Sequence, residues 1–438
     1  MNVTVEPGRL TGEVSAPSSK SEAHRLLICA AFAPGTTDID CTTTSEDIDA
    51  TAGCLEALGA HITRTRRGFR VVPVPGTSAT DNVPEPISGA LLDCGESGST
   101  LRFLLPVVAA LGCDARLTGH GRLPQRPLSP LYEELVAHGA ELSPQGQMPL
   151  HVGGRLRPGR FSLPGNVSSQ YVSGLLLAAP LMGAPVEVVV SEPVESLPYI
   201  DITVAALRRF GVSVSEDHVE GPGGGARSYV VGGGSRLSSP GTVSVGGDWS
   251  GAAFWLAAGA LSEDGVAVRG LDVTSTQGDR QVLAALALLG ARVLRAPDGA
   301  ACTHDGLVGR ELDVSSCPDL VPPLAAVAAL AQGTTRITGA ARLRLKESDR
   351  LETVSAAVNA LGGRARIVND NLIIDGVTRL AGGTVDAAGD HRIAMMAAVL
   401  AARSDAPVTI LGAECVAKSY PGFFEDLARL GGTYRKES

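Results

Sequence analysis

Eight basic residues stand where helices are expected to begin, and they are the strongest indication of chemistry in this chain. They are Lys20, Arg25, Arg102, Arg126, Lys346, Arg350, Arg392 and Lys418. A positive side chain opposes the helix dipole at this end, so it destabilises the helix unless an anion offsets the charge. Free N–H groups at helix starts also favour anions. The plainer interpretation, that these side chains only reach into solvent, does not account for their shared placement. We therefore expect them to bind anionic ligands.

Two carboxylates and one histidine stand among these cations. Asp319 and Glu347 lie in the same polar loops, and His391 stands within Asp-His-Arg at a helix start. A protein that only binds anions needs the cations but has no need of carboxylates beside them. The pattern thus favours proton transfer near a bound anion. Asp47, Ser97 and Ser250 are interpreted instead as ordinary helix-start residues, either N-caps or first helical residues.

Composition limits the class of ligand. The chain has 438 residues, with 46 acidic against 37 basic side chains and a net charge of −9. No run of Lys and Arg is present. Nucleic acids and anionic membranes both need a clustered positive field, so neither is expected as a partner. The expected ligands are small anions.

Cysteine spacing and hydropathy place the chain in a reducing compartment. The eight cysteines form no C-x-x-C and have no histidine at metal spacing, so we expect buried free thiols, no metal site and no cofactor. The first residues lack the basic and apolar segments of a signal peptide. Pro180, Gly183 and Pro185 interrupt the longest apolar stretch, which is untypical of a membrane span. A cytoplasmic protein is expected.

A repeated phrase predicts the architecture. An amphipathic stretch ends in glycine before a strand-like run six times, with glycine spacings of 80, 72, 79, 72 and 69 residues. Glycine at such a place is typical of a left-handed helix C-cap. Each unit has the order βαβαββ. The phrases end at Gly59, Gly139, Gly211, Gly290, Gly362 and Gly431.

The six units are expected to form an α/β protein of two domains, each with three βαβαββ repeats around buried helices. Units near 73 residues are longer than the roughly 20 to 50 residues of most solenoid repeats, so a stacked solenoid is disfavoured. Unit six lacks its closing hairpin, which the N-terminal strands NVTVE and LTGEVSA could supply. The predicted domains are therefore residues 19–238, and residues 1–18 with 239–438. The chain is expected to cross between them at 16–19 and 235–241.

The motifs in these loops resemble the signature set of the 5-enolpyruvylshikimate-3-phosphate synthase family. The resemblance runs in order from Val14 to Pro421. Its segments are APSSKSEAHR around Lys20, GESGSTLR around Gly98, Arg126-Pro, GNVSSQ around Ser168, Pro198-Tyr199, KESDRL from Lys346, Asp-His391-Arg392 and Ala-Lys418-Ser-Tyr-Pro.

The resemblance implies a fold and a reaction. The fold is that of the enolpyruvyl transferases, an inside-out α/β barrel in each of two hinged domains. The reaction transfers the enolpyruvyl group of phosphoenolpyruvate to the 5-hydroxyl of shikimate 3-phosphate, with release of phosphate, in the shikimate pathway to aromatic amino acids. Because both substrates are polyanions, they account for the cationic helix starts. A monomer that closes its two domains around these substrates is expected.

The resemblance also implies roles for individual residues. Shikimate 3-phosphate would be bound by Lys20, Ser21, Arg25, Ser168, Ser169, Gln170, Ser196, Tyr199, Asp319 and Lys346. Phosphoenolpyruvate would be bound by Lys20, Gly98, Arg126, Gln170, Arg350, Arg392 and Lys418. Asp319 is the candidate base at the hydroxyl, and Glu347 with Lys20 would act at the carbon and the phosphate. The catalytic set is completed by His391, which would hydrogen-bond either Glu347 or the phosphate.

Three positions depart from the family pattern, and two alternative functions stay open. Glu96 and Arg342 stand where asparagine is familiar, and Phe103 replaces a frequent proline. They leave the shape of the phosphoenolpyruvate pocket, and thus glyphosate sensitivity, undetermined.

One alternative function is that of the sister transferase that acts on UDP-N-acetylglucosamine, which would show a Lys-Asn pair and a reactive loop cysteine. Here Ser21 follows Lys20, and Cys113 lies in an apolar connection. The other is a non-catalytic phosphate-binding protein.

Overall fold

The computed structural model describes residues 1–77, 84–85, 87–221 and 224–437, which divide into two compact units. One unit is Ser18–Val245, and the other joins Met1–Pro17 to Gly246–Ser438. Within the described residues the strands form six sheets of four strands each. The predicted number of repeats is therefore confirmed.

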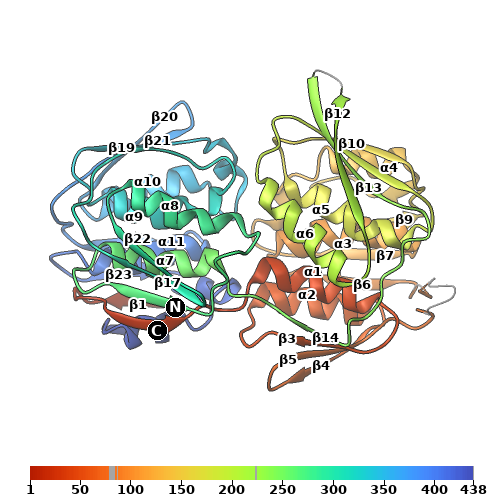
Figure 1. The fold of residues 1–438 in the computed structure, drawn as a ribbon, viewed down its shortest axis with the longest axis horizontal. Helices are drawn as coiled ribbons and strands as arrows, with labels where there is room; N and C mark the ends of the chain where they lie inside the picture. Colours follow the sequence, from red (N-terminus) through yellow and green to blue (C-terminus); the bar gives the residue numbers. More distant parts are fainter. Residues whose placement is uncertain (78–83, 86, 222–223, 438) are drawn as a thin grey trace. The chain divides into compact units, whose positions relative to one another are not determined.

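The unit Ser18–Val245 holds the first three repeats, coloured red to green in Figure 1. The elements of repeat one are α1 (Lys20–Ala31), β3 (Thr37–Asp40), α2 (Glu46–Ala57), β4 (His61–Thr65), β5 (Gly68–Val72) and β14 (Thr242–Ser244). Those of repeat two are β6 (Ala90–Asp93), α3 (Gly98–Leu111), β7 (Ala115–Thr118), η1 (Leu123–Gln125), α4 (Leu131–Ala137), β8 (Ala140–Leu142) and β9 (Leu150–Gly154). Those of repeat three are β10 (Arg160–Pro164), α5 (Ser169–Ala178), η2 (Ala179–Leu181), β11 (Val186–Ser191), α6 (Leu197–Arg209), β12 (Val214–Gly221) and β13 (Gly224–Val231).

The second unit holds repeats four to six. The elements of repeat four are β2 (Gly12–Ser15), α7 (Trp249–Ala260), β15 (Val266–Arg269), η3 (Gly278–Gln281), α8 (Val282–Leu288), β16 (Arg292–Ala296) and β17 (Gly299–Thr303). Those of repeat five are β18 (Glu311–Asp313), η4 (Pro318–Leu320), α9 (Val321–Ala328), β19 (Thr334–Thr338), η5 (Ala341–Leu345), α10 (Arg350–Ala360), β20 (Arg364–Val368) and β21 (Asn371–Asp375). Those of repeat six are β22 (Gly383–Asp386), α11 (His391–Ala401), β23 (Val408–Leu411), η6 (Ala413–Lys418), α12 (Phe423–Arg429), β24 (Tyr434–Glu437) and β1 (Asn2–Val5).

Every sheet has the same pairing, which follows from the βαβαββ order. In repeat two, β6 pairs parallel with β7, β7 antiparallel with β9, and β9 antiparallel with β8. The helix between the first two strands supplies the long crossover that parallel pairing needs. The six phrase glycines have φ between +81° and +104°. This left-handed conformation suits glycine, so the predicted C-caps are confirmed.

The N-terminal strands complete two different sheets. β1 lies between β23 and β24 in the sheet of repeat six, as predicted. The prediction is wrong for the second strand, because β2 pairs parallel with β15 in repeat four, where Val14 is buried. Likewise β14 pairs parallel with β3 in repeat one. The contacts thus place the second passage between units after Val245 rather than at 235–241.

The first helix of each repeat forms the core. In the second unit α7, α9 and α11 pack on one another, and every residue of α9 and α11 is buried. In the unit Ser18–Val245, α3 packs closely on α5. At their closest approach, a Cβ added at Gly174 would lie 2.4 Å from the carbonyl oxygen of Arg102. The apolar residues thus bury these helices, while their N-terminal turns carry the polar loops.

Candidate functional site

The predicted residues of the unit Ser18–Val245 lie at helix N-termini. Lys20 begins α1 after the N-cap Ser19, and Gly98 begins α3 after the N-cap Ser97. Ser168 caps α5, whose first two residues are Ser169 and Gln170. Tyr199 lies in the first turn of α6. Each of these N-termini presents N–H groups that favour an anion.

Lys20 forms an ion pair that sequence reasoning missed. Its Nζ lies 2.8 Å from the Oδ2 of Asp47, and both side chains are largely buried. The interpretation of Asp47 as an N-cap is wrong, because Ser45 caps α2 and Asp47 lies in its first turn. Asp47 therefore fixes the ammonium group of Lys20.

Arg25 is buried in contacts with its own unit. Its guanidinium donates to Thr203 Oγ1 at 2.6 Å, to the Tyr199 carbonyl at 2.9 Å and to Ser173 Oγ at 3.2 Å. It lies 4.6 Å from the ring centre of Phe103. Burial lowers the pKa of Arg25 to about 9, so the side chain stays charged at neutral pH. Arg25 thus ties α1 to α5 and to the first turns of α6, and Phe103 supplies the surface beneath it.

Ser196 has two features that suit a ligand-binding hydroxyl. Its φ is +55°, a left-handed conformation that is uncommon for a residue with a side chain. It is buried, and among the described residues its Oγ has no hydrogen-bond partner. A buried hydroxyl without a partner costs stability, which a bound ligand could offset.

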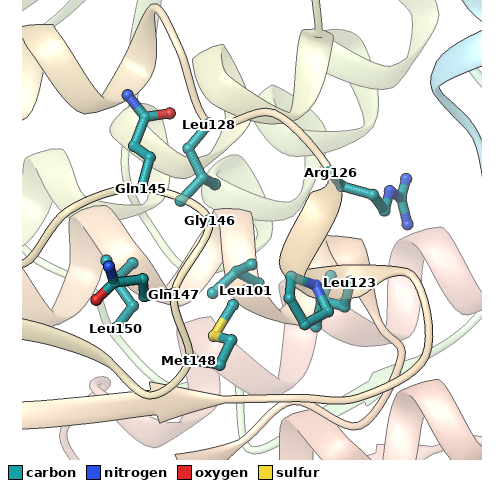
Figure 2. A pocket seen from close by; sticks show the side chains of 10 residues that line it. Leu101, Leu123, Arg126, Leu128, Gln145, Gly146, Gln147, Met148 and Leu150 are labelled. Carbon is teal, nitrogen blue, oxygen red and sulfur yellow. The ribbon is translucent and has the colours of Figure 1, made fainter.

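Arg126 lies against Gly98. A Cβ added at Gly98 would be 2.4 Å from Arg126 Nη1, so only glycine leaves this space. Figure 2 shows Arg126 at a small pocket lined in part by Leu101, Leu123 and Met148, with its guanidinium pointing away from these apolar side chains. The pocket therefore packs the stem of Arg126, and the charge lies at the start of α3.

Arg102 positions Gln170, a function that was not assigned to it from the sequence. Arg102 Nη1 donates to Gln170 Oε1 at 2.8 Å, and Nη2 donates to the Pro127 carbonyl at 3.0 Å. Gln170 Nε2 in turn donates to Ser99 Oγ at 2.9 Å. The signals for Arg102 in the sequence were its place among the cationic helix starts and its place at the end of the motif GESGSTLR. These contacts tie α5 to the first turn of α3.

In the second unit, Asp319 lies at the centre of a cationic cluster. Its Oδ1 accepts from Lys346 Nζ at 2.9 Å and from Arg350 Nη1 at 2.7 Å. Its Oδ2 accepts from Arg392 Nη2 at 3.2 Å. Burial alone would raise the pKa of Asp319, but Arg392, Lys346 and Arg350 hold it well below its usual value. Asp319 is thus a carboxylate at neutral pH.

Glu347 and Asp390 complete this cluster. Arg350 Nη2 donates to Glu347 Oε2 at 2.5 Å. Asp390 caps α11 and accepts from Arg350 Nε at 2.7 Å and from Ser348 Oγ at 3.0 Å. Asp390 was predicted only as part of the Asp-His-Arg motif. The cluster is therefore an alternation of three cations with three carboxylates.

His391 and Lys418 lie at the same end of α11. His391 is the first residue of α11 and is buried. Lys418 ends η6, and its Nζ donates to the Gly389 carbonyl at 2.8 Å, directly before Asp390. The structure thus brings Asp319, Lys346, Glu347, Arg350, His391, Arg392 and Lys418 to the helix starts of repeats five and six.

A second buried carboxyl lies near Asp319. Asp279 in η3 accepts a hydrogen bond from Ser250 Oγ of α7. Burial, followed by the charge of Asp319, raises the pKa of Asp279 to about 6. The interpretation of Ser250 as an N-cap is wrong, because Asp248 caps α7. The interpretation of Ser97 as a cap is confirmed, since its Oγ accepts from the N–H of Thr100 at 3.2 Å.

The three departures from the family pattern lie near these residues. Glu96 reaches the loop before η1, where a Cβ added at Gly121 would lie 2.4 Å from its Oε2. Phe103 is buried beside Arg25, and Arg342 lies in η5, shortly before Lys346.

Among the described residues, no helix is long and apolar enough to cross a membrane. The same residues include no group of three or more His, Cys, Asp or Glu side chains suited to a metal.

Comparisons with known proteins agree over the whole chain. A family model described as EPSP synthase (3-phosphoshikimate 1-carboxyvinyltransferase) matches residues 5–427. A Clostridium kluyveri protein named 3-phosphoshikimate 1-carboxyvinyltransferase is 40% identical over 431 residues, covering 98% of this chain and 97% of that protein. A protein of the same name from Clostridium acetobutylicum is 37% identical over 436 residues, covering 98% and 97%.

Solved structures give the same result for the fold. An EPSP synthase from Acinetobacter baumannii superposes with a TM-score of 0.79 and 28% identity, covering 99% of this chain and 100% of that one. The enolpyruvyl transferase NikO from Streptomyces tendae has a TM-score of 0.73 and covers 99% of this chain and 98% of its own. Its identity is 20%, so it supports the fold alone.

Proposed function

Because this chain belongs to the EPSP synthase family, we propose that the residue clusters described above carry out the reaction of that family. The reaction is the transfer of the enolpyruvyl group from phosphoenolpyruvate to the 5-hydroxyl of shikimate 3-phosphate, with release of phosphate. This is a step of the shikimate pathway. The observation that carries the residue assignment is Asp319 held among Lys346, Arg350 and Arg392.

We assign shikimate 3-phosphate mainly to the helix starts of repeats one and three. Serine hydroxyls and N–H groups at α1 and α5 suit its phosphate and ring hydroxyls, and the unpartnered Ser196 hydroxyl suits one more oxygen. Arg25 holds Tyr199 in place through its buried protein contacts, and we propose that it also binds the ligand. The proposed set is Lys20, Ser21, Arg25, Ser168, Ser169, Gln170, Ser196, Tyr199, Asp319 and Lys346.

Phosphoenolpyruvate requires denser positive charge, because its phosphate and carboxylate lie close together. The planar guanidinium of arginine pairs with two oxygens of such groups. Gly98 lets the guanidinium of Arg126 lie against the start of α3, and Arg350 and Arg392 are held in orientation by Asp390 and Asp319. The proposed set is Lys20, Gly98, Arg126, Gln170, Arg350, Arg392 and Lys418.

Asp319 is proposed as the base at the 5-hydroxyl. Within this cluster its carboxylate is a weak base, because three cations lower its pKa. Bound phosphate and carboxylate groups bring negative charge to the same cations. The stabilisation of ionised Asp319 then decreases and its proton affinity rises. Asp319 would thus become an effective base only when both substrates are present.

Glu347 and Lys20 are proposed to act at the methylene carbon and the phosphate of phosphoenolpyruvate. As the hydroxyl oxygen bonds to C2 of phosphoenolpyruvate, its methylene carbon gains a proton, giving a tetrahedral intermediate. Elimination returns that proton from the methyl group, re-forms the double bond and expels phosphate. Glu347, held by Arg350, is the proposed proton carrier at carbon. Cations stabilise the developing positive charge only indirectly, by neutralising the neighbouring anions.

The proposed groups come from both units of the chain. We propose that the two substrates draw these two units together in a closed state. We also propose a cytoplasmic monomer that acts without nucleic acid, membrane, metal or organic cofactor. The net charge of −9, with no run of cations, supports the choice of small substrates over polyanionic surfaces.

The Asp319→Asn variant tests the proposed base. Asparagine keeps the shape but cannot accept the proton, so turnover should decrease by about 100-fold or more. Calorimetric binding of shikimate 3-phosphate should stay measurable, because the groups of the other unit are unchanged. Asp305→Asn, at an exposed position, is the charge-matched control and should keep turnover. Near-normal turnover of Asp319→Asn would refute its role.

A further inference from the structure

A chain of four buried polar side chains connects three helices of the unit Ser18–Val245. His24 Nδ1 lies 2.6 Å from Thr51 Oγ1, which lies 2.7 Å from Thr100 Oγ1. Thr100 Oγ1 donates to Ser97 Oγ at 2.8 Å. All four side chains are buried. The chain thus runs from α1 through α2 to the N-cap of α3.

The direction of donation fixes the tautomer of His24. Each hydroxyl has a single proton. Thr100 directs its proton to Ser97 Oγ, or to the Asp47 carbonyl 3.4 Å away. Thr51 must therefore donate to Thr100, which leaves Thr51 only as an acceptor for His24. His24 is thus a donor through Nδ1, with the ring proton on that nitrogen.

The surroundings of His24 favour its neutral form. Burial, and then the charges of Lys20 and Arg25, hold the pKa of His24 well below its usual value. Among the described residues its Nε2 has no hydrogen-bond partner. A proton on Nε2 would therefore be left unpaired in the core, at a substantial cost in free energy. The ring also meets the ring of Phe103 edge to face, with centres 6.3 Å apart.

The chain ends at groups that the proposed function places around phosphoenolpyruvate. Ser97 Oγ accepts from the N–H of Thr100 at 3.2 Å and so closes the first turn of α3, which begins at Gly98. Near its middle, the chain reaches the carbonyl of Asp47, whose carboxylate pairs with Lys20 at 2.8 Å. The Thr100 hydroxyl therefore lies within reach of both the N-cap of α3 and the backbone of Asp47, the partner of Lys20.

We propose that His24, Thr51 and Thr100 are positioning residues for the phosphoenolpyruvate site, acting through Ser97 and Asp47. The inference rests on the proposed placement of phosphoenolpyruvate at Gly98 and Lys20. It assigns these residues no contact with either substrate. Their effect is on the orientation of the N–H groups of α3 and of the Lys20 ammonium.

The Thr51→Val variant tests this inference, with Thr51→Ser as the matched variant that restores the hydroxyl. Thr51→Val should raise the KM for phosphoenolpyruvate about three- to tenfold, as expected for the loss of one or two buried hydrogen bonds. The KM for shikimate 3-phosphate should change by less than about twofold, and Thr51→Ser should restore the wild-type values. Equal effects on both substrates, or no effect, would overturn the inference.

Thr335→Val separates positioning from a general effect of the substitution. Thr335 is fully buried in β19, and its Oγ1 has no hydrogen-bond partner within the part of the chain that the structure describes. Replacing this hydroxyl by a methyl group should leave both KM values unchanged. A change in KM as large as that of Thr51→Val would mean that any buried Thr→Val change has this effect, and would overturn the inference.

The tautomer can be measured without turnover. The chain has eight histidines, and in protein with ¹⁵N-labelled histidine the resonances of His24 are identified by their loss in His24→Asn. A proton on Nδ1 supports the chain of donors, whereas a proton on Nε2 overturns it. If the wild-type protein released no phosphate from phosphoenolpyruvate, the proposed function would fail, but the tautomer would still decide whether the hydroxyl chain is correct.

Discussion

Arg350 donates to both carboxylate oxygens of Asp390, from Nε at 2.7 Å and from Nη2 at 3.2 Å. The side chain of Arg350 is 1% exposed and that of Asp390 is 0% exposed. The remaining nitrogen, Nη1, donates to Asp319 at 2.7 Å. Asp390 therefore orients, from within the core, a guanidinium whose other edge reaches the proposed base.

Asp390→Asn should destabilise the fold and weaken phosphoenolpyruvate binding. The variant removes the charge of one of the three carboxylates that pair with the buried Arg350, and breaking a buried ion pair typically costs about 3 to 5 kcal/mol. Denaturant unfolding measures this loss, and the KM for phosphoenolpyruvate should rise in parallel. Asp405→Asn breaks an exposed pair with Arg379 and should cost less than about 1 kcal/mol. Equal losses in the two variants would contradict the account.

Glu347→Gln should separate catalysis from binding. Glutamine retains an oxygen for the hydrogen bond from Arg350 Nη2, but it cannot carry the proton. Turnover should decrease about 100-fold or more, while calorimetric binding of shikimate 3-phosphate stays close to that of the wild type. Glu352→Gln, with 62% of its side chain exposed, is the control. Near-normal turnover would remove Glu347 from the mechanism.

Gly98→Ala should raise the KM for phosphoenolpyruvate. The added methyl group would lie 2.4 Å from Arg126 Nη1, so the guanidinium must move away from the start of α3. Steady-state kinetics with both substrates varied would show the effect. Gly53→Ala in α2, where a Cβ meets nothing within 4 Å, is the control and should be neutral or slightly stabilising. An unchanged KM in Gly98→Ala would refute the placement of phosphoenolpyruvate.

The raised pKa of Asp279 predicts that its contribution to the stability of the fold changes with pH. Burial, and then the charge of Asp319, raises its pKa to about 6, whereas an unfolded aspartic acid has a pKa of about 3.9. The folded state binds this proton more tightly, so the group stabilises the fold at low pH. That stabilisation is lost as the pH rises from about 4 through 6.

The asparagine of Asp279→Asn does not titrate. The Tm of the variant minus the Tm of the wild type should therefore increase between about pH 4 and pH 7 and then level off. Thermal unfolding at several pH values measures this difference. A constant difference between Asp279→Asn and the wild type over this range would contradict the raised pKa.

Helix ends and starts could be predicted from local sequence patterns. Strands that pair with distant segments could not, because no local pattern shows which partner they take. Gly59 and its five counterparts could be predicted, because a C-cap needs only a helix and a glycine. The strand Thr242–Ser244 is three residues long and pairs with β3, far away in the sequence. No local pattern distinguishes it from a linker.

The same reason explains which site residues were missed. Asp47 follows Ser-Glu and resembles a capping residue, and its pairing with Lys20 depends on how α1 packs against α2. The hydrogen bond from Arg102 to Gln170 depends on the close approach of α3 to α5. Motifs thus indicated the residues proposed to meet the ligand. The residues that orient them became visible only through packing between helices.

Phosphate release from phosphoenolpyruvate tests the central claim most directly. The purified chain is given shikimate 3-phosphate in one reaction and UDP-N-acetylglucosamine in another. We predict phosphate release only with shikimate 3-phosphate. Release only with UDP-N-acetylglucosamine would contradict the acceptor site built from Ser21, Arg25 and Tyr199. Release with neither, from folded protein whose Tm still rises with the ligands, would contradict catalysis itself.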